Sequence, residues 1–337
     1  MRKPSVLIAR AIAPEVVAFL QQHFEVHTNA QDAVWTPAQL VQRLQGMDGM
    51  LSTGSERVDA ALLAACPQLK VVANMAVGFN NLDVAAMNAA GVQGTNTPDV
   101  LTETTADFGF ALLMATARRI TEGEHYLRAG RWTQWSYELL LGAEVHGSTL
   151  GIIGMGRIGQ GIARRAAHGF GMHVLYHNRS RLAAPLEAQC RAQYVSQAEL
   201  LQRADHVMLV LPYTPDNHHT IGAQQLALMK PTATLINIAR GGIVDDAALA
   251  HALQAGQIAA AGLDVFEGEP RVHPDLLALP NVVLTPHIAS ATAGTRRAMA
   301  QLAADNLVAV LGAQAARTPV NTPDAAARAQ RWASNPL

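Results

Sequence analysis

The sequence predicts an α/β protein made of two doubly wound parallel-sheet domains with a cleft between them. Short apolar segments alternate with helical patterns along the chain, as in parallel sheets whose strands are joined by crossover helices. Half of the 337 residues are apolar and only 15% are charged, which is enough to build sizeable cores. At about 150 residues per domain, this length fits two domains.

The first hundred residues contain five apolar segments that predict the strands of one sheet. These segments read SVLIAR, FEVHT, GMLST, LKVVANMA and VQGTN, and helical patterns begin at Pro14 and at the segment PAQLVQRL. Residues 101–130 then keep helical spacing for about seven turns. We expect one long helix there, capped by Thr102, that joins the two domains.

A second alternating series begins at residue 148 and predicts another parallel sheet. Its apolar segments read STLGIIG, HVLYHN, DHVMLVLP, ATLINIA, IAAAGLDVF and NVVLTP. An amphipathic helix at about 293–311 follows, and the simplest topology returns it to the first domain. The expected domains are therefore 1–100 with 291–337, which is discontinuous, and 101–290. Residues 317–337 have the composition of a loose tail.

The overall composition excludes several classes of protein. A net charge of −1 gives no broad field for binding nucleic acid. Cys66 and Cys190 cannot form a disulfide framework and lack metal-ligand spacing, so we expect two reduced structural thiols. No apolar run reaches the roughly 18 residues of a membrane span. The apolar N-terminus is interrupted by Arg10, Pro14 and Glu15, which favours a strand and helix over a signal peptide. We expect a cytoplasmic protein.

The segment GIIGMGRIGQGIARR carries the pattern Gly154-x-Gly156-x-x-Gly159 between a strand and a helix. Gly154 permits a tight turn, Gly156 allows backbone to approach a pyrophosphate, and Gly159 allows close packing of helix on strand. The N-terminus of the helix offers amides and a positive dipole end to phosphates. A second strand arrives about 20 residues later, as dinucleotide binding requires. The alternative is an ordinary glycine turn.

The second strand of this unit ends at Asn178, where an acidic residue would bind the ribose hydroxyls of NAD. Arg179 and Arg181 can bind a 2′-phosphate through charge-assisted hydrogen bonds, and Ser180 adds a hydroxyl. Residues 178–181 therefore favour NADP(H) as the cofactor, and NAD(H) is the second cofactor considered. The alternative is that the arginines are merely solvated.

Three further segments supply groups that could reduce a 2-oxo acid. Arg240, Glu269 and His287 each follow a predicted strand, at the edge where doubly wound sheets bind ligands. Histidine ordinarily titrates near neutral pH, so His287 can exchange the proton, and Glu269 can orient it. Arg240 can hold a carboxylate and a carbonyl oxygen together. Taken singly, each of these residues is more often structural than catalytic.

The segments GMGRIGQGIARR, NIARGGIVDDAAL, AAGLDVFEGEP and TPHIASAT resemble those of the D-isomer-specific 2-hydroxyacid dehydrogenases. The resemblance implies a flavodoxin-like substrate domain, a Rossmann dinucleotide-binding domain, and a catalytic set of Arg240, Glu269 and His287. Within this family, the most similar members are the glyoxylate/hydroxypyruvate reductases, including those that reduce 2-ketogluconate. The segments that carry this similarity are GAEVHGSTLGIIGMGRIG, AAHGFGMHVLYHNRSR and PVN. NADPH-preferring members of that group share the two arginines after the second strand.

The resemblance also implies further binding residues. The substrate is expected to contact the backbone of Val77 and Gly78, together with Arg240, Ser290 and Trp135 of a partner subunit. The cofactor is expected to contact the following residues: Gly154, Met155, Gly156, Arg157, Ile158, Gly159, Asn178, Arg179, Ser180, Arg181, Pro212, Thr214, Ile238, Ala239, Arg240, Asp264, His287 and Ala289. The apolar long helix and the aromatic arm around Trp132 and Trp135 predict a homodimer.

The sequence thus predicts an NADPH-dependent reductase that converts glyoxylate, hydroxypyruvate or 2-ketogluconate to D-2-hydroxy acids. Two alternatives stay open: an NAD-linked dehydrogenase of the same family, and a dinucleotide-sensing binding protein on the same fold. No metal site is expected, because the pair His218 and His219 has no third ligand nearby in sequence.

Overall fold

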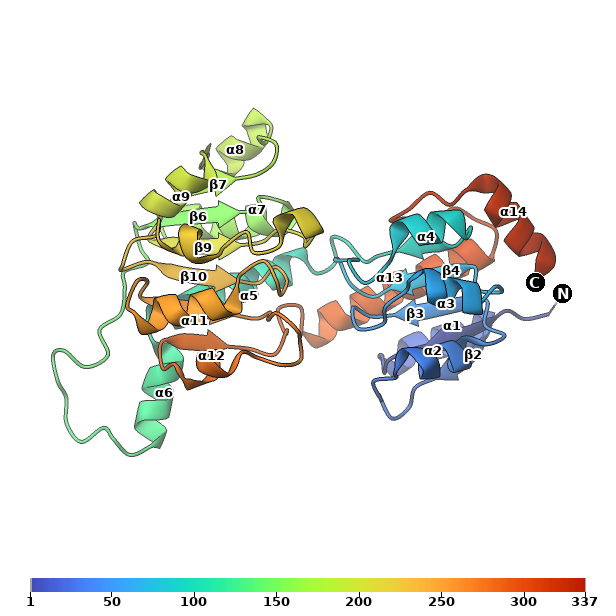
Figure 1. Cartoon of the computed structure of the whole chain (residues 1–337), viewed down its shortest axis with the longest axis horizontal. Coiled ribbons are helices and arrows are strands. Elements are labelled where there is room, and N and C mark those ends of the chain that lie inside the picture. Colours follow the sequence, from blue (N-terminus) through green and yellow to red (C-terminus); the bar gives the residue numbers. More distant parts are fainter. Residues whose placement is uncertain (1, 337) are drawn as a thin grey trace. The chain divides into compact units, whose positions relative to one another are not determined.

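The computed structural model describes residues 2–336, and they divide into two compact units. Unit 1 comprises the residues up to 101 together with those from 291 onward, and unit 2 comprises residues 102–290. Each unit is a sheet with helices packed against it (Figure 1). Every strand pair in both sheets is parallel. The predicted class of two parallel-sheet α/β domains is therefore confirmed.

Unit 1 is built on a five-stranded sheet in the order β2-β1-β3-β4-β5, the flavodoxin-like order. All five strands coincide with predicted segments: β1 (Ser5–Ile8), β2 (Glu25–Thr28), β3 (Gly49–Ser52), β4 (Val71–Asn74) and β5 (Gln93–Thr95). The helices are α1 (Pro14–His23), α2 (Pro37–Leu44), α3 (Ala60–Ala65), α4 (Val84–Ala89), α13 (Ala293–Leu311) and α14 (Ala325–Ser334). Apolar side chains of α2, α3 and α4 share one core with those of β1, β3 and β4.

Helix α13 occupies the range expected for the last amphipathic helix. Thr292 caps it, since its side chain accepts a hydrogen bond from the Thr295 amide. The helix packs against β3, β4 and α1. The C-terminal segment is thereby part of unit 1.

The expectation of a loose tail after residue 317 is wrong. Residues 325–334 form α14, whose Arg331 side chain donates to the Cys66 carbonyl at 3.0 Å and the Leu69 carbonyl at 2.8 Å. These hydrogen bonds attach the helix to the chain after α3. Composition alone could not show them, because the acceptors are backbone carbonyls far away in sequence.

Unit 2 is built on a seven-stranded sheet in the order β12-β11-β10-β9-β6-β7-β8. The strands are β6 (Thr149–Ile153), β7 (His173–His177), β8 (Ala192–Tyr194), β9 (His206–Leu209), β10 (Thr234–Asn237), β11 (Ala260–Leu263) and β12 (Val282–Leu284). The first strand, β6, lies between β7 and β9, so strand order reverses there. This is the Rossmann arrangement, which binds ligands outside the carboxyl ends of the strands at the reversal.

The connections of unit 2 are mostly helical. They are α5 (Thr102–Ala117), α6 (Ile120–Arg128), α7 (Arg157–Arg164), α8 (Ala184–Cys190), α9 (Gln197–Arg203), α10 (Ala223–Leu226), α11 (Asp246–Gln254) and α12 (Pro274–Ala278), with a π-helical turn at Arg165–Gly169 and a 3-10 turn at Pro215–Asn217. Six strands had been predicted. Strand β8 was not among them, because its three residues at the sheet edge are too few to show a period.

The single long helix expected over 101–130 is also wrong. The chain forms α5 and α6, separated by Arg119 in the left-handed region at φ 52°. The Ala117 carbonyl accepts the Ala143 amide at 2.8 Å instead of an amide one turn later. The chain that returns at 141–143 therefore ends α5. In addition, Thr102 is the first residue of α5 rather than its cap.

Cys66 and Cys190 are buried free thiols, as predicted. Burial raises the pKa of both thiols, which makes them poor nucleophiles. Among the described helices, none combines the length and apolar character needed to cross a bilayer.

Candidate active site

The glycine-rich turn between β6 and α7 has the geometry that the three glycines predict. Gly154 has φ +102°, and a Cβ there would lie 2.4 Å from the Val210 carbonyl oxygen. A Cβ on Gly159 would lie 2.4 Å from the Gly154 carbonyl oxygen. Both positions exclude a side chain because backbone lies too close.

Gly156 differs from the other two glycines. It is exposed, and a Cβ placed on it would meet nothing within 4 Å. Its hydrogen side chain is therefore not required by the packing of the protein itself. Gly156 caps α7, whose first-turn amides have no intrahelical acceptor. An open glycine at the positive dipole end of a helix fits the pyrophosphate of a dinucleotide.

Asn178, immediately after β7, is tied to this turn. Its side-chain oxygen accepts the Met155 amide at 2.6 Å, and its carbonyl accepts the Tyr194 hydroxyl at 3.2 Å. The side-chain oxygen thus shapes the glycine turn, while the end of β7 carries no negative charge.

The two arginines beyond Asn178 lie in different environments. Arg181 donates to both carboxylate oxygens of Glu187 at 2.9 and 2.8 Å, and the buried Tyr176 hydroxyl donates to the same carboxylate at 2.5 Å. Arg179 is exposed and makes no hydrogen bond or ion pair with any residue between 2 and 336. Arg179 is therefore the more available cation.

The contacts of Glu187 shift two pKa values. Hydrogen bonds from Arg181 and then Tyr176 lower the pKa of Glu187 to about 2. Burial, followed by the hydrogen bond to Glu187, raises the pKa of Tyr176 to about 12. The carboxylate is therefore ionised at neutral pH and holds Arg181 near α8.

The loop after β9 contains Pro212 and Thr214. The Asn217 side chain donates to the Pro212 carbonyl at 2.6 Å and accepts the Thr214 amide at 2.7 Å. These bonds fix the loop at the carboxyl end of β9, beside the β6 turn.

Arg240 follows β10 on a turn that Asn237 holds. The Asn237 side chain accepts the Ala239 amide at 3.0 Å, and Arg240 donates to the Ala239 carbonyl at 2.7 Å. Burial lowers the pKa of the guanidinium, although the charge of Glu269 opposes this shift. An arginine still remains protonated at physiological pH. Ile238, which lies between Asn237 and Ala239 in this turn, is buried.

His287 and Glu269 are directly joined. The Nδ1 atom of His287 lies 2.8 Å from Oε2 of Glu269, and Oε1 accepts the Phe266 amide at 3.0 Å. Burial tends to raise the pKa of Glu269, but the contacts with His287, the Phe266 amide and the charge of Arg240 together lower it. The carboxylate therefore accepts the Nδ1 proton, which leaves Nε2 of the exposed imidazole to exchange a proton with a ligand.

Asp264 fixes the backbone that carries His287. This fully buried carboxylate accepts the Thr285 hydroxyl at 2.7 Å and the amides of Ile288 and Ala289 at 2.8 and 2.9 Å. Burial raises its pKa despite these hydrogen bonds. Asp264 was predicted only to contact the cofactor, and its anchoring role was not predicted, although its position at the end of β11 could be read from the sequence. Ser290, half-buried, ends the same loop.

In unit 1, the loop after β4 presents the amides of Val77 and Gly78. The Asn96 side chain donates to the Val77 carbonyl at 2.8 Å, and Asn74 donates to the Gly78 carbonyl at 3.1 Å. The bond to the Val77 carbonyl holds the peptide plane of the Gly78 amide, and the Ala76 carbonyl, which accepts the Thr97 amide at 2.9 Å, holds that of the Val77 amide. Neither amide hydrogen has an acceptor within residues 2–336, so both can bind a ligand carboxylate.

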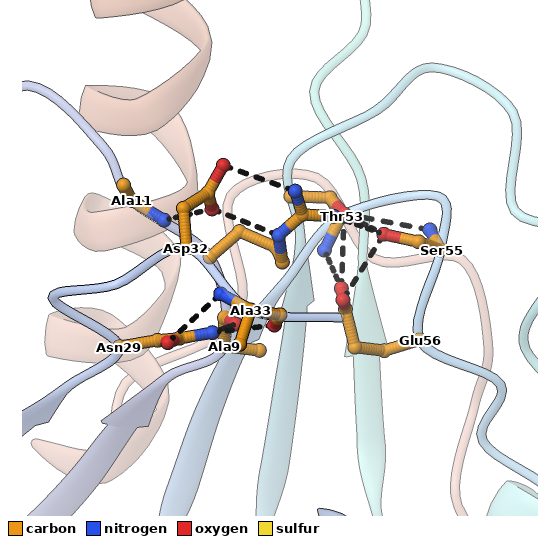
Figure 2. Close-up of polar contacts among 9 residues, drawn as sticks. Ala9, Ala11, Asn29, Asp32, Ala33, Thr53, Ser55 and Glu56 are labelled. Atoms are coloured by element: carbon orange, nitrogen blue, oxygen red, sulfur yellow. Dashed lines mark hydrogen bonds and ion pairs between the residues drawn. The ribbon is translucent and has the colours of Figure 1, made fainter. Parts of the chain in front are cut away.

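The neighbouring carboxyl edge of unit 1 carries charges that are already paired (Figure 2). Arg10 donates to both oxygens of Asp32 at 2.8 and 3.0 Å, and these hydrogen bonds lower the pKa of Asp32. Glu56 accepts the Thr53 amide at 2.6 Å and the Ser55 hydroxyl at 3.0 Å. These side chains bind one another across the loops after β1, β2 and β3.

Comparison with known proteins agrees with the geometry. Residues 110–289 match the model of the D-isomer specific 2-hydroxyacid dehydrogenase NAD binding domain. The glyoxylate reductase of Thermococcus onnurineus is 47% identical over 323 residues, which cover 95% of this chain and 96% of that protein. The glyoxylate reductase of Pyrococcus furiosus is 45% identical with the same coverage of both chains.

A solved structure is similar over nearly the whole chain. The NADPH-dependent glyoxylate/hydroxypyruvate reductase of Sinorhizobium meliloti, in complex with NADP and malonate, has a TM-score of 0.85 and 37% identity. The match covers 95% of this chain and 97% of that one. The glycine turn and the open position at Gly156 fit a nicotinamide dinucleotide. The chain is a nicotinamide-dinucleotide-dependent oxidoreductase and belongs to the D-isomer-specific 2-hydroxyacid dehydrogenase family.

Proposed function

We propose that the protein reduces small 2-oxo acids to D-2-hydroxy acids with NADPH, and that glyoxylate, hydroxypyruvate and 2-ketogluconate are its substrate class. The observation that carries the proposal is the 2.8 Å contact between Nδ1 of His287 and Glu269. The two glyoxylate reductases support glyoxylate, and the Sinorhizobium enzyme supports glyoxylate and hydroxypyruvate.

His287 is the proposed general acid. Reduction adds a hydride to the carbonyl carbon and a proton to its oxygen, which leaves a 2-hydroxy acid. Nε2 of His287 donates that proton, while Glu269 fixes the ring through Nδ1. Asp264 is a positioning residue, since it holds the backbone on both sides of Ile288.

Arg240 and the loop at Val77 and Gly78 are the proposed substrate-binding groups. The guanidinium can pair with the carboxylate and polarise the ketone, because its planar fork matches two oxygens. The amides of Val77 and Gly78 add neutral donors for the carboxylate. Ser290 is a further proposed substrate contact at the end of the His287 loop.

The proposed cofactor site uses the glycine turn at residues 154–159 with the first turn of α7, residues 178–181 after β7, and the loops that contain Pro212, Thr214 and residues 238–240. When bound, the reduced nicotinamide supplies the hydride. Arg179 is the proposed 2′-phosphate ligand, because its guanidinium is exposed and makes no competing ion pair within residues 2–336. Asn178 does not repel a phosphate as an acidic residue would.

The test is to mix purified protein with NADPH and each of the three 2-oxo acids and to follow cofactor oxidation. We expect turnover and a product of D configuration, identified by chiral chromatography. If NADPH is not oxidised with any of the three acids, the proposal fails. Ranking kcat/KM among the acids defines the preferred substrate.

A second candidate is an NAD-linked dehydrogenase with the same catalytic set. The observation that favours it is the ion pair between Arg181 and Glu187, which occupies one of the two arginines. The ratio of kcat/KM for NADPH to that for NADH decides between the two: a ratio above one supports the first proposal, and a ratio below one supports the second.

We further propose a homodimer formed through the exposed apolar residues of α6 and the arm that follows it. These are Ile120, Leu127, Trp132, Trp135, Tyr137 and Leu141. Trp135, with 77% of its surface exposed, is the proposed contribution to the partner's active site. A monomer in light scattering at micromolar concentration contradicts this proposal.

A further inference from the structure

Two histidines and one glutamate of unit 2, none of which has a role in the proposed reaction, meet in one cluster. Nε2 of His219 lies 3.0 Å from Oε2 of Glu267, and Nε2 of His218 lies 3.8 Å from Oε1 of the same carboxylate. The candidate ligand atoms of all three residues lie within 4.8 Å of one another. Both imidazoles therefore direct the same ring nitrogen toward one carboxylate.

The other nitrogen of each ring also faces an oxygen. Nδ1 of His218 is 3.3 Å from the Tyr213 hydroxyl, and Nδ1 of His219 is 3.8 Å from the Asp245 carboxylate. Metal-binding histidines usually pair their second nitrogen with an oxygen in this way, because the pairing fixes the ring and raises its basicity. The Tyr213 contact is within hydrogen-bond distance, and the Asp245 carboxylate faces the second ring from slightly farther away, so both rings have an oxygen partner besides Glu267.

The backbone holds the two histidines in place. His219 lies in the left-handed region at φ 51°, and its amide donates to the Gly242 carbonyl at 2.7 Å. The two imidazole rings stack with centroids 3.8 Å apart. A non-glycine residue at positive φ costs free energy that neighbouring contacts must offset. The hydrogen bond from His219 to Gly242 thus fixes the histidine pair against the chain that follows Arg240.

We propose that His218, His219 and Glu267 bind a divalent transition-metal ion of the Zn²⁺ class. Two imidazole nitrogens and one carboxylate oxygen form a common three-residue ligand set for Zn²⁺, and water completes the coordination. Zinc holds these atoms at about 2.0–2.2 Å. The three side chains are partly exposed and can rotate slightly to reach that distance.

The ion would join two loops of unit 2. His218 and His219 follow the 3-10 turn after β9, while Glu267 follows β11 and lies two residues before Glu269. Glu267 is 48 residues from His219, so the set is invisible to a search for ligands close in sequence. The expectation that no metal site exists rested on such a search.

The test is Zn²⁺ binding by the purified full chain, measured by competition with a chromophoric chelator, together with the visible spectrum of bound Co²⁺. We expect one ion per chain. Glu267→Gln and His219→Asn should weaken binding by at least about tenfold, since each removes a ligand. Asparagine is chosen because it tolerates the left-handed backbone.

The matched control is His125→Ala. His125 also lies near a glutamate, at 3.8 Å from Glu124, but it has no second histidine. This variant should bind Zn²⁺ as the wild type does, and thermal melts should show that all the variants are folded. Less than one ion per wild-type chain, or equal affinity in wild type, E267Q and H219N, overturns the proposal and leaves a hydrogen-bonded surface cluster only.

Discussion

The carboxyl edges of the two sheets contain similar residue types but use them differently. At the edge of unit 1, Arg10 binds Asp32 and the hydroxyls of the β3 loop bind Glu56 (Figure 2). At the edge of unit 2, the glycine turn leaves first-turn amides and the open Gly156, and the exposed Arg179 follows. One edge satisfies its own charges, whereas the other leaves donors for an anion.

The difference teaches that the sheet alone does not make a ligand site. Both sheets are parallel and doubly wound, and both place loops at the same type of edge. What distinguishes them is the number of donors that lack an internal acceptor. In the loop after β4 of unit 1, the donors that lack an internal acceptor are the amides of Val77 and Gly78. This division fits a substrate carboxylate in unit 1 and a dinucleotide in unit 2.

The largest predicted effect comes from the proton donor of unit 2. His287→Ala should lower kcat by about 10²–10⁴-fold, the usual contribution of general acid catalysis, while NADPH still binds. Stopped-flow kinetics and fluorescence titration with NADPH measure the two quantities. Turnover that persists at the wild-type level would falsify the role of His287. Loss of turnover with binding retained also distinguishes an enzyme from a dinucleotide-sensing protein.

A matched change in unit 1 sharpens the comparison. Asp32→Asn breaks a charge pair that serves only its own loops, so kcat should stay near the wild-type value. A drop comparable to that of H287A would show that the Arg10–Asp32 pair takes part in the reaction.

The glycines of the β6 turn give the next largest effects, and they should separate binding from stability. Gly156→Ala should raise the KM for NADPH at least about tenfold, because its Cβ occupies the phosphate approach, and should lower the melting temperature less than Gly159→Ala, because the Cβ meets no protein atom and only the N-cap of α7 is weakened. Gly159→Ala should destabilise the protein by about 1–3 kcal/mol, since its Cβ overlaps the Gly154 carbonyl.

Gly54→Ala is the control in unit 1. Gly54 is equally open, with nothing within 4 Å of its Cβ, but it lies in the loop after β3. It should change neither the cofactor KM nor the melting temperature. If G54A and G156A behave alike, the open position at Gly156 has no special relation to a dinucleotide.

Smaller effects are expected at the two arginines after β7. Arg179→Ala should raise the KM for NADPH about tenfold and the KM for NADH little, because a charge-assisted hydrogen bond to phosphate is lost. Arg181→Ala should act more weakly, since Glu187 already binds that guanidinium. Steady-state kinetics with both cofactors measure this, and Arg203→Ala on the surface of α9 is the control. Equal changes for both cofactors would mean that Arg179 is merely solvated.

The sequence predicted the parts of the fold that repeat a local pattern. Strands β1 and β6 and helix α13 could be located because apolar period and capping are local properties. The break at Arg119 and the attachment of Arg331 could not, since each depends on a hydrogen bond between groups distant in sequence.

The same limit applies to the site. The glycine motif could be located, and the proximity of Glu269 to His287 was expected from strand ends. The anchoring by Asp264 and the pairing of Arg181 with Glu187 needed three-dimensional neighbours.

The smallest predicted effect is on the stability that Glu187 provides by pairing with Arg181. Glu187 has a pKa of about 2, below its ordinary value of 4.5, so its ionised form stabilises the fold above pH 4.5 and this contribution fades as the pH falls toward 2. Glu187→Gln should therefore lower the melting temperature slightly at pH 7, and the gap from wild type should narrow below pH 4.5. Glu199→Gln, which removes an exposed partner of Arg203, should show almost no gap at either pH. Melting curves across this range measure both variants. A gap for E187Q that stays constant or widens in acid would contradict an ionised Glu187 as the stabilising partner of Arg181.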